Sequence, residues 1–232
     1  MENGKFLNSA IIVLLTFNVI SSVHAATITF EEVSSGLTAM SNSVGSAIPT
    51  NSRLTDQYLS SNGVSFTSGA GYAALVNHGG GNPSASVPNI IGGTTVGGTL
   101  DYNAPITISF FDVANPSNKA ITNTFAIQGD WFPLGFGQIF ATAFNSEGNV
   151  LGTTSDTDNK VFGVSGPLLQ FNLAGIRSVI ISGDNGTVGF DQLEFGDLTP
   201  VAVADVPLPA TLALMMSGLG LLGFSARRRT QI

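Results

Sequence analysis

The stretch His78-Gly79-Gly80-Gly81 holds residue types that could take part in catalysis. A histidine followed by glycines can supply backbone N–H groups to an oxyanion, but the reaction also needs a serine in a Gly-x-Ser-x-Gly turn and a catalytic histidine. The sequence has no such turn, and its other histidine, His24, lies in the N-terminal apolar segment. One histidine cannot serve both the loop and the triad, so we interpret this stretch as a glycine loop.

Carboxylates are the other groups with catalytic potential. Fourteen Asp and Glu residues lie between Ala26 and Asp205, and none of their spacings is diagnostic of a glycosidase acid pair. Asp156-Thr157-Asp158-Asn159-Lys160 begins like a calcium loop, but Lys160 replaces a ligand and the later Glu is missing. We interpret it as a solvated turn. We therefore expect a protein that is not an enzyme, with a secreted glycan hydrolase that uses paired carboxylates as the alternative.

Composition excludes further classes of protein. Charged residues make up 10 % of the chain, against ~25 % in a typical soluble domain. Only four basic residues accompany the fourteen acids between positions 26 and 205, which argues against nucleic-acid binding because phosphate contacts need clustered cations. The chain has no cysteine, so disulfides and zinc–thiolate sites are absent.

One segment is unusually aromatic for a loop. Gly129 to Phe136 contains the single tryptophan, Trp131, together with Phe132 and Phe136. Aromatic rings of this kind can form a platform that binds sugar faces by stacking. The favoured interpretation is that they cap the core of the fold, and the sugar platform is the functional alternative.

The elements that must position these residues are short strands. Alternating or continuous apolar patterns separated by turn signals at roughly ten-residue spacing predict an all-β domain, a β-sandwich or jelly roll. The predicted strands are Thr27–Phe30, Gly63–Phe66, Ile106–Phe110, Ile139–Phe144 with both faces covered, Val150–Leu151, Leu168–Leu173, Ser178–Ile181 and Val188–Phe195. Only Arg53–Ser60 reads as a short helix or turn.

The N-terminus has the features of a secretory signal peptide. Lys5 precedes an apolar stretch from Ala10 to Ile20, and Val23-His24-Ala25 provides a cleavage site after Ala25. The alternative is a retained anchor, but the apolar stretch is shorter than the ~20 residues of a membrane span. We expect export with residues 1–25 removed.

The C-terminal segment predicts a single membrane-spanning helix. Ala210 to Ala226 is free of charge over seventeen residues, at the lower edge of the ~17–25 that can span a bilayer. Pro207 and Pro209 place the start of the helix at about Ala210, and Arg227 to Arg229 keep the C-terminus in the cytoplasm. The precursor should therefore be anchored in the inner membrane with its body outside.

This tail resembles a known sorting signal. Val206-Pro207-Leu208-Pro209-Ala210, the apolar helix and Arg227-Arg228-Arg229 look like the VPLPA-CTERM variant of the PEP-CTERM signal, in which Glu more usually stands at the place of Leu208. The resemblance implies recognition by a membrane-embedded exosortase or a variant of it, cleavage near the prolines, and delivery to the cell surface, outer envelope or extracellular matrix.

The body also resembles a family, the galactose-binding-like jelly rolls. The resemblance rests on a run of segments: Ile28-Thr29-Phe30-Glu31-Glu32, Gly63-Val64-Ser65-Phe66, Ile139 to Gly152, and Gly189-Phe190-Asp191-Gln192-Leu193-Glu194-Phe195. It implies that the first and last strands pair. Glu31 or Glu32 would then lie beside Asp191, and these acids are the candidate ligands of a structural calcium ion.

Together these observations predict four segments: a signal peptide at 1–25, a β-sandwich ectodomain at 26–198, a linker at 199–206 and a sorting tail at 207–229. The predicted function is non-enzymatic, with an adhesive, structural or carbohydrate-binding role in the extracellular polysaccharide matrix. An ice-binding surface protein is a further alternative, although Thr94-Thr95 and Thr153-Thr154 are isolated pairs and not a regular array.

Overall fold

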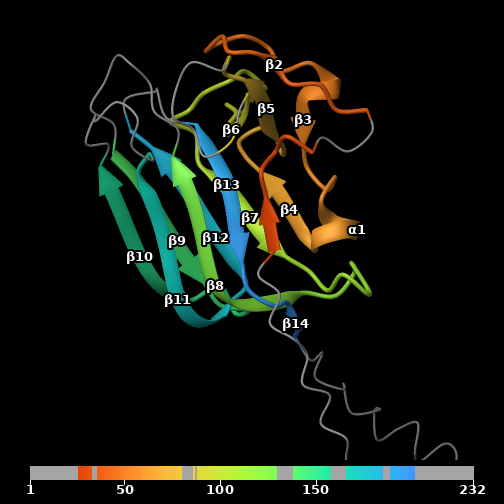
Figure 1. Ribbon diagram of the computed structural model, residues 1–232, viewed down its shortest axis with the longest axis vertical. Helices are drawn as coiled ribbons and strands as arrows, with labels where there is room; N and C mark the ends of the chain where they lie inside the picture. The colour runs from red at the N-terminus through yellow and green to blue at the C-terminus, as the bar shows by residue number, and fades with distance from the viewer. Residues whose placement is uncertain are drawn as a thin grey trace, which may run out of the picture.

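The computed structural model describes residues 26–32, 36–79, 86, 88–129, 138–157, 166–184 and 189–201. These residues form two β-sheets packed face to face, with little helix (Figure 1). The sequence-based prediction of an all-β sandwich is confirmed. The signal peptide and the sorting tail lie outside the described residues, and among the described residues no helix has the length and apolarity to span a membrane.

The first sheet has nine strands, and β8 and β13 lie at its centre. Its main path runs β11-β8-β13-β6-β5-β2, with β1 beside β13, β14 beside β8 and β3 beside β5. The bounds are β1 Ala26–Ile28, β2 Met40–Ser41, β3 Arg53–Leu54, β5 Ala73–Asn77, β6 Asn89–Gly92, β8 Ala120–Gly129, β11 Leu168–Ile176, β13 Phe190–Phe195 and β14 Thr199–Pro200.

The second sheet has five antiparallel strands in the order β10-β9-β12-β7-β4. They are β4 Val64–Thr67, β7 Ile106–Phe110, β9 Gln138–Phe144, β10 Val150–Thr157 and β12 Ser178–Gly183. Two short helical segments, the 3-10 helix η1 at Thr50–Ser52 and helix α1 at Leu59–Asn62, lie before β4 in the chain.

The core forms because each strand turns every second side chain inward. In β7, Ile106, Ile108 and Phe110 are fully buried, while Thr107 and Ser109 between them are half-buried on the outer face. Burying an aliphatic or aromatic side chain of this size contributes about 1.5–3 kcal/mol. The core can therefore supply the stability that disulfides would provide in other exported domains.

The predicted helix or turn at Arg53–Ser60 is wrong in its first part. Arg53 and Leu54 form β3, because the fully buried Leu54 pairs with Ala73 of β5. The α-helix begins only at Leu59 and ends at Asn62. The next residue, Gly63, caps it with a φ of 68°, in the left-handed region that glycine adopts without strain.

Strands β8, β9 and β10 also differ from the predictions. The longest strand, β8, was not predicted, because its polar stretch Thr122-Asn123-Thr124 resembles a loop. In β9, Phe140 is 39 % exposed, so the outer face of this strand is not fully covered. Asp156 and Thr157 belong to β10 and not to a solvated turn; the rest of that segment lies outside the described residues.

Candidate functional site

The site predicted from the acidic residues begins where the first strand meets the last long strand. β1 pairs antiparallel with β13, with Ile28 opposite Leu193. This pairing confirms the strand contact that placed Glu31 near Asp191. A β-bulge in β13, between Asp191 and Leu193, makes Gln192 an extra residue and leaves Asp191 opposite Gln128 of β8.

Asp191 is fully buried, and among the described residues Ser86 and Gln192 donate hydrogen bonds to its carboxylate. The backbone N–H of Ser86 donates to Oδ2 at 2.6 Å, and the Ser86 hydroxyl lies 2.7 Å from Oδ1. The backbone N–H of Gln192 also donates to Oδ1 at 2.7 Å. A buried carboxylate is costly unless it is paired or hydrogen-bonded, so these donors are what make the burial of Asp191 tolerable.

The Ser86 hydroxyl joins Asp191 to the residues that follow β1. Its Oγ lies 2.8 Å from the carbonyl oxygen of Thr29 and 3.5 Å from Oε1 of Glu31, whose carboxylate also accepts the backbone N–H of Asn89 at 2.6 Å. A hydroxyl has one proton and can donate it to one acceptor at a time. The Ser86 hydroxyl can therefore donate to only one of the oxygen atoms of Thr29, Glu31 and Asp191 at a time.

The backbone is strained on both sides of this cluster. Phe30, which precedes Glu31, has a φ of 61°, and Gln192, which follows Asp191, has a φ of 40°. Such conformations of non-glycine residues cost on the order of 1–3 kcal/mol each. The packing of Phe30 holds its conformation, because its ring lies fully buried against the ring of Phe66 with a centroid distance of 5.8 Å.

Glu32 takes a different place from the other two acids. Its backbone carbonyl accepts a hydrogen bond from the Tyr58 hydroxyl at 3.2 Å, and its side chain is exposed. Burial, followed by the charges of Glu32 and Glu31, raises the pKa of Tyr58 to about 12.

Among the described residues no group of three His, Cys, Asp or Glu is arranged to hold a metal, so a cation here would need hydroxyl and backbone oxygens as well.

The other predicted site residues cannot be placed with this cluster. Ala25, the aromatic residues Trp131, Phe132 and Phe136, and the whole sorting motif from Val206 to Ala210 with Arg227, Arg228 and Arg229 lie outside the described residues. Of the glycine loop, His78 and Gly79 are described: the His78 N–H donates to the Pro88 carbonyl at 2.8 Å.

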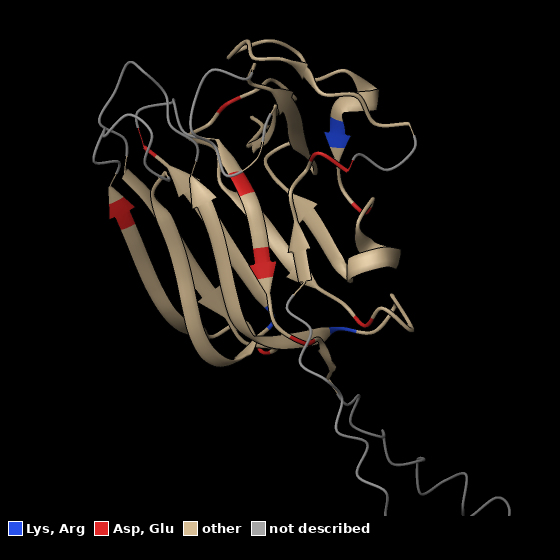
Figure 2. Ribbon diagram, in the orientation of Figure 1, with Lys and Arg blue, Asp and Glu red and all other residues tan. Residues whose placement is uncertain are grey.

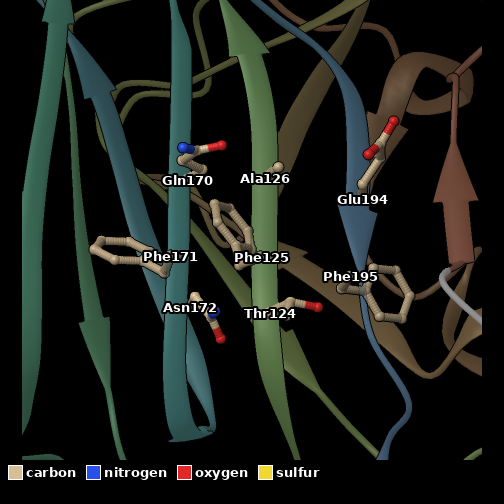
Figure 3. Close-up of a pocket in the computed structure, with 8 residues that line it drawn as sticks. All are labelled: Thr124, Phe125, Ala126, Gln170, Phe171, Asn172, Glu194 and Phe195. Carbon is tan, nitrogen blue, oxygen red and sulfur yellow. The ribbon is translucent and has the colours of Figure 1, made fainter. Parts of the chain in front are cut away.

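The structure adds a surface feature that was not predicted, a groove on the outer face of the first sheet. One hollow of about 450 Å³ is lined by the outward-facing side chains of Thr124 and Ala126 on β8, Gln170 and Asn172 on β11, and Glu194 on β13 (Figure 3). A second hollow of about 290 Å³ continues it, shares three of these residues and adds Gln128, Gly166, Leu168 and Gln192. One indication of this groove is present in the sequence, the alternating polar residues in Gln170-x-Asn172 and Gln192-x-Glu194. That these residues lie side by side follows only from the pairing register of the strands.

Basic residues are sparse over the described body, as Figure 2 shows. Arg177 is nearly buried between β11 and β12, and its guanidinium stacks on the Phe111 ring at 4.5 Å from the centroid. Its Nε and Nη1 have no hydrogen-bond acceptor among the described residues, and burial lowers its pKa. Neither hollow of the groove includes it, so it does not belong to the candidate site.

The solved structures similar to this chain include three that are each 14 % identical to it in sequence. A DUF4465 family protein from Bacteroides caccae has a TM-score of 0.34, covering 78 % of this chain and 97 % of its own. The enzymatically active domain of bacteriophage CBA120 tailspike protein 4 has a TM-score of 0.28, covering 67 % and 21 %. An arabinose-bound GH51 α-L-arabinofuranosidase has a TM-score of 0.29, covering 81 % and 33 %. No curated protein sequence matches the chain.

The C-terminal part of the chain matches the model of a known sequence motif. It begins shortly after β14 and Val201, where the described body ends, and it includes the proline motif and the arginine cluster. Residues 205–229 match the PEP-CTERM protein-sorting motif, which implies a protein that is exported, processed by an exosortase-like enzyme and sorted to the cell envelope or surface.

Proposed function

We propose that this protein is an exported, non-enzymatic β-sandwich that is held briefly in the inner membrane by its C-terminal helix and is then released to the cell surface or the extracellular polysaccharide matrix. Its role there is adhesive, through binding of carbohydrate. The observation that carries this proposal is the sorting motif at residues 205–229, which directly follows a β-sandwich body. The Val-Pro-Leu-Pro-Ala form of the motif is the proposed cleavage region.

The position of the chain ends supports a precursor attached to the membrane. Ala26, the residue after the proposed signal cleavage, lies opposite Phe195 at the end of β13. β14 and the Val201 N–H, which donates to the Lys119 carbonyl at 2.8 Å, then lead to the tail. β14 is the last described strand and lies at the lower end of the body in Figure 1. A body whose two ends lie near each other can fold while either end is still in the membrane.

The arrangement of the acids supports a role other than catalysis. Among the described residues, Glu194 is the one carboxylate that lines the groove, whereas glycoside hydrolases use two that flank the scissile bond. Asp191 is buried and held by backbone and hydroxyl donors. A glycan hydrolase that uses paired carboxylates is the alternative, and turnover of a soluble glycan that is lost in Glu194→Gln would favour it.

A structural calcium ion is part of the same proposal. Calcium in proteins takes six to eight oxygen ligands, often including backbone carbonyls. Oxygen atoms of Thr29, Glu31 and Asp191 already lie around the Ser86 hydroxyl. A bound cation would relieve the repulsion between the two carboxylates and fix β1 against β13.

Mass spectrometry of the protein from cells and from culture medium tests the sorting proposal. We expect released protein to begin at Ala26 and to end between Pro207 and Ala210, because both apolar ends are removed. A Pro207→Ala/Pro209→Ala variant should accumulate in the membrane with Arg229 intact, and Thr199→Ala, in β14 upstream of the motif, serves as its control. Released protein that retains Arg229, or full-length protein dissolved in the cytosol, would overturn the proposal.

A further inference from the structure

We propose that the groove on the outer face of the first sheet binds an uncharged polysaccharide chain. The groove is formed by Thr124, Ala126, Gln128, Gln170, Asn172 and Glu194. This inference rests on the proposed function for the presence of extracellular polysaccharide, but the site and the kind of polysaccharide are derived from the residues of the groove.

The shape of the groove follows from strand register. Gln170 of β11 lies opposite Ala126 of β8, which lies opposite Glu194 of β13. A methyl group between two long polar side chains leaves a hollow, and Figure 3 shows these residues side by side on neighbouring strands. From Thr124 to Gln128 the groove follows the strand for ~13 Å, since a strand rises ~3.3 Å per residue. That length suits a segment of a chain better than one small molecule.

A rigid base supports the groove. The residues between the groove positions, Phe125, Phe171 and Phe195, point into the core and are at most 8 % exposed. The Phe125 and Phe171 rings pack together with a centroid distance of 6.2 Å. The outward side chains are therefore held on packed strands rather than on loops, which reduces the conformational entropy lost on binding.

The groove offers hydrogen-bonding groups that the other described residues do not use. Gln170 and Asn172 are exposed, and their amides have no hydrogen-bond partner among the described residues. Each amide carries two donors and one acceptor, which matches the donor and acceptor capacity of neighbouring sugar hydroxyls. Glu194 is oriented by the Gln192 amide, whose Nε2 donates to Oε1 at 2.6 Å, and its remaining oxygen can accept further hydroxyl protons.

The charge of the groove selects an uncharged ligand. Glu194 is the one charged residue among the described residues that line the groove, and none of the described basic residues Arg53, Lys119 and Arg177 lines either hollow. A polyuronate or a nucleic acid would meet a carboxylate with no compensating cation. An apolar peptide would leave the amides of Gln170 and Asn172 without partners, which costs free energy. A neutral, hydroxyl-rich chain avoids both penalties.

Affinity electrophoresis of the full-length chain in detergent tests this inference, with gels that contain a neutral glucan, a neutral galactomannan or the polyuronate alginate. We expect at least one neutral polysaccharide to retard the protein and alginate to have no effect. Ala126→Leu fills the hollow without adding a ring that could stack on sugar, and it should weaken the Kd about tenfold or more. The control Thr153→Leu, at an exposed position of β10 in the other sheet, should bind as the wild type does.

A second variant protects the test against misfolding. Gln170→Ala/Asn172→Ala removes only exposed amides, so it should keep the melting temperature of the wild type and still lose about tenfold in affinity. The inference is overturned if no neutral polysaccharide retards the wild type, if alginate alone does, or if both groove variants bind normally. Tail removal and surface delivery, measured in the same strains, separate this failure from a failure of the sorting proposal.

Discussion

Tyr58 shows how one side chain makes stability depend on pH. Its ring packs edge-on against Phe30, with a centroid distance of 6.0 Å, and burial with two nearby acids raises its pKa to about 12 from 10.0. In the unfolded chain the phenol ionises near pH 10, whereas in the folded protein it stays protonated until about pH 12. Stability conferred by this group is therefore complete below pH 10 and is lost as the pH rises towards 12.

We expect the ionisation of Tyr58 to lower the free energy of unfolding by about 1–2 kcal/mol between pH 10 and 12, after allowance for screening by solvent. Tyr58→Phe keeps the ring contacts and cannot ionise, so its loss of stability over this range should be smaller. Urea unfolding at several pH values measures the difference, with Tyr72→Phe as the control. If the free energy of unfolding falls equally steeply with pH in Tyr58→Phe and in the wild type, Tyr58 does not cause the loss of stability.

The cluster around Ser86 acts at the scale of elements, because it ties the end of β1 to β13 and to the segment before β6. If calcium binds there, 1 mM calcium with a Kd of about 10 µM stabilises the fold by about 2.7 kcal/mol. For a domain of this size that corresponds to a rise in melting temperature of roughly 5–10 °C relative to a chelator. Asp191→Asn should abolish the response, since it removes one of the two carboxylates.

A second aspartate provides the matched control for this calcium prediction. Asp156 of β10 accepts the backbone N–H groups of Thr157 and Leu168 at 2.8 Å each, away from the cluster. Asp156→Asn should therefore keep the calcium response while changing the net charge by the same amount. A wild-type melting temperature that is the same in calcium and in chelator would rule out the ion.

For the whole molecule, the body should remain stable when the tail is removed. Cleavage near Pro207 leaves β14 and the hydrogen bond between Val201 and Lys119 intact. We expect the released form and the detergent-solubilised precursor to melt within about 2 °C of each other, because the core is formed by residues that cleavage does not touch. Differential scanning fluorimetry of both forms measures this, and a loss of more than about 5 °C on release would mean that the tail is part of the fold.

The sequence alone determined the features that local patterns encode. Alternation in segments such as Ile106–Phe110 predicted a sandwich, because a strand points its side chains to opposite faces. The apolar ends and the proline motif likewise act through contiguous residues, and the match at 205–229 agrees with the predicted sorting class. Local patterns did not predict β8, because its polar stretch becomes a strand only through its pairing with β11 and β13.

Only the tertiary structure decided which distant residues meet. Ser86 joins Glu31, 55 residues before it, to Asp191, 105 residues after it, and a bulge at Gln192 sets the register that makes this possible. The groove likewise exists only because β11, β8 and β13 align their outward positions. Register arises from the packing of the entire core, and a shift by one residue would turn every side chain of a strand to the opposite face.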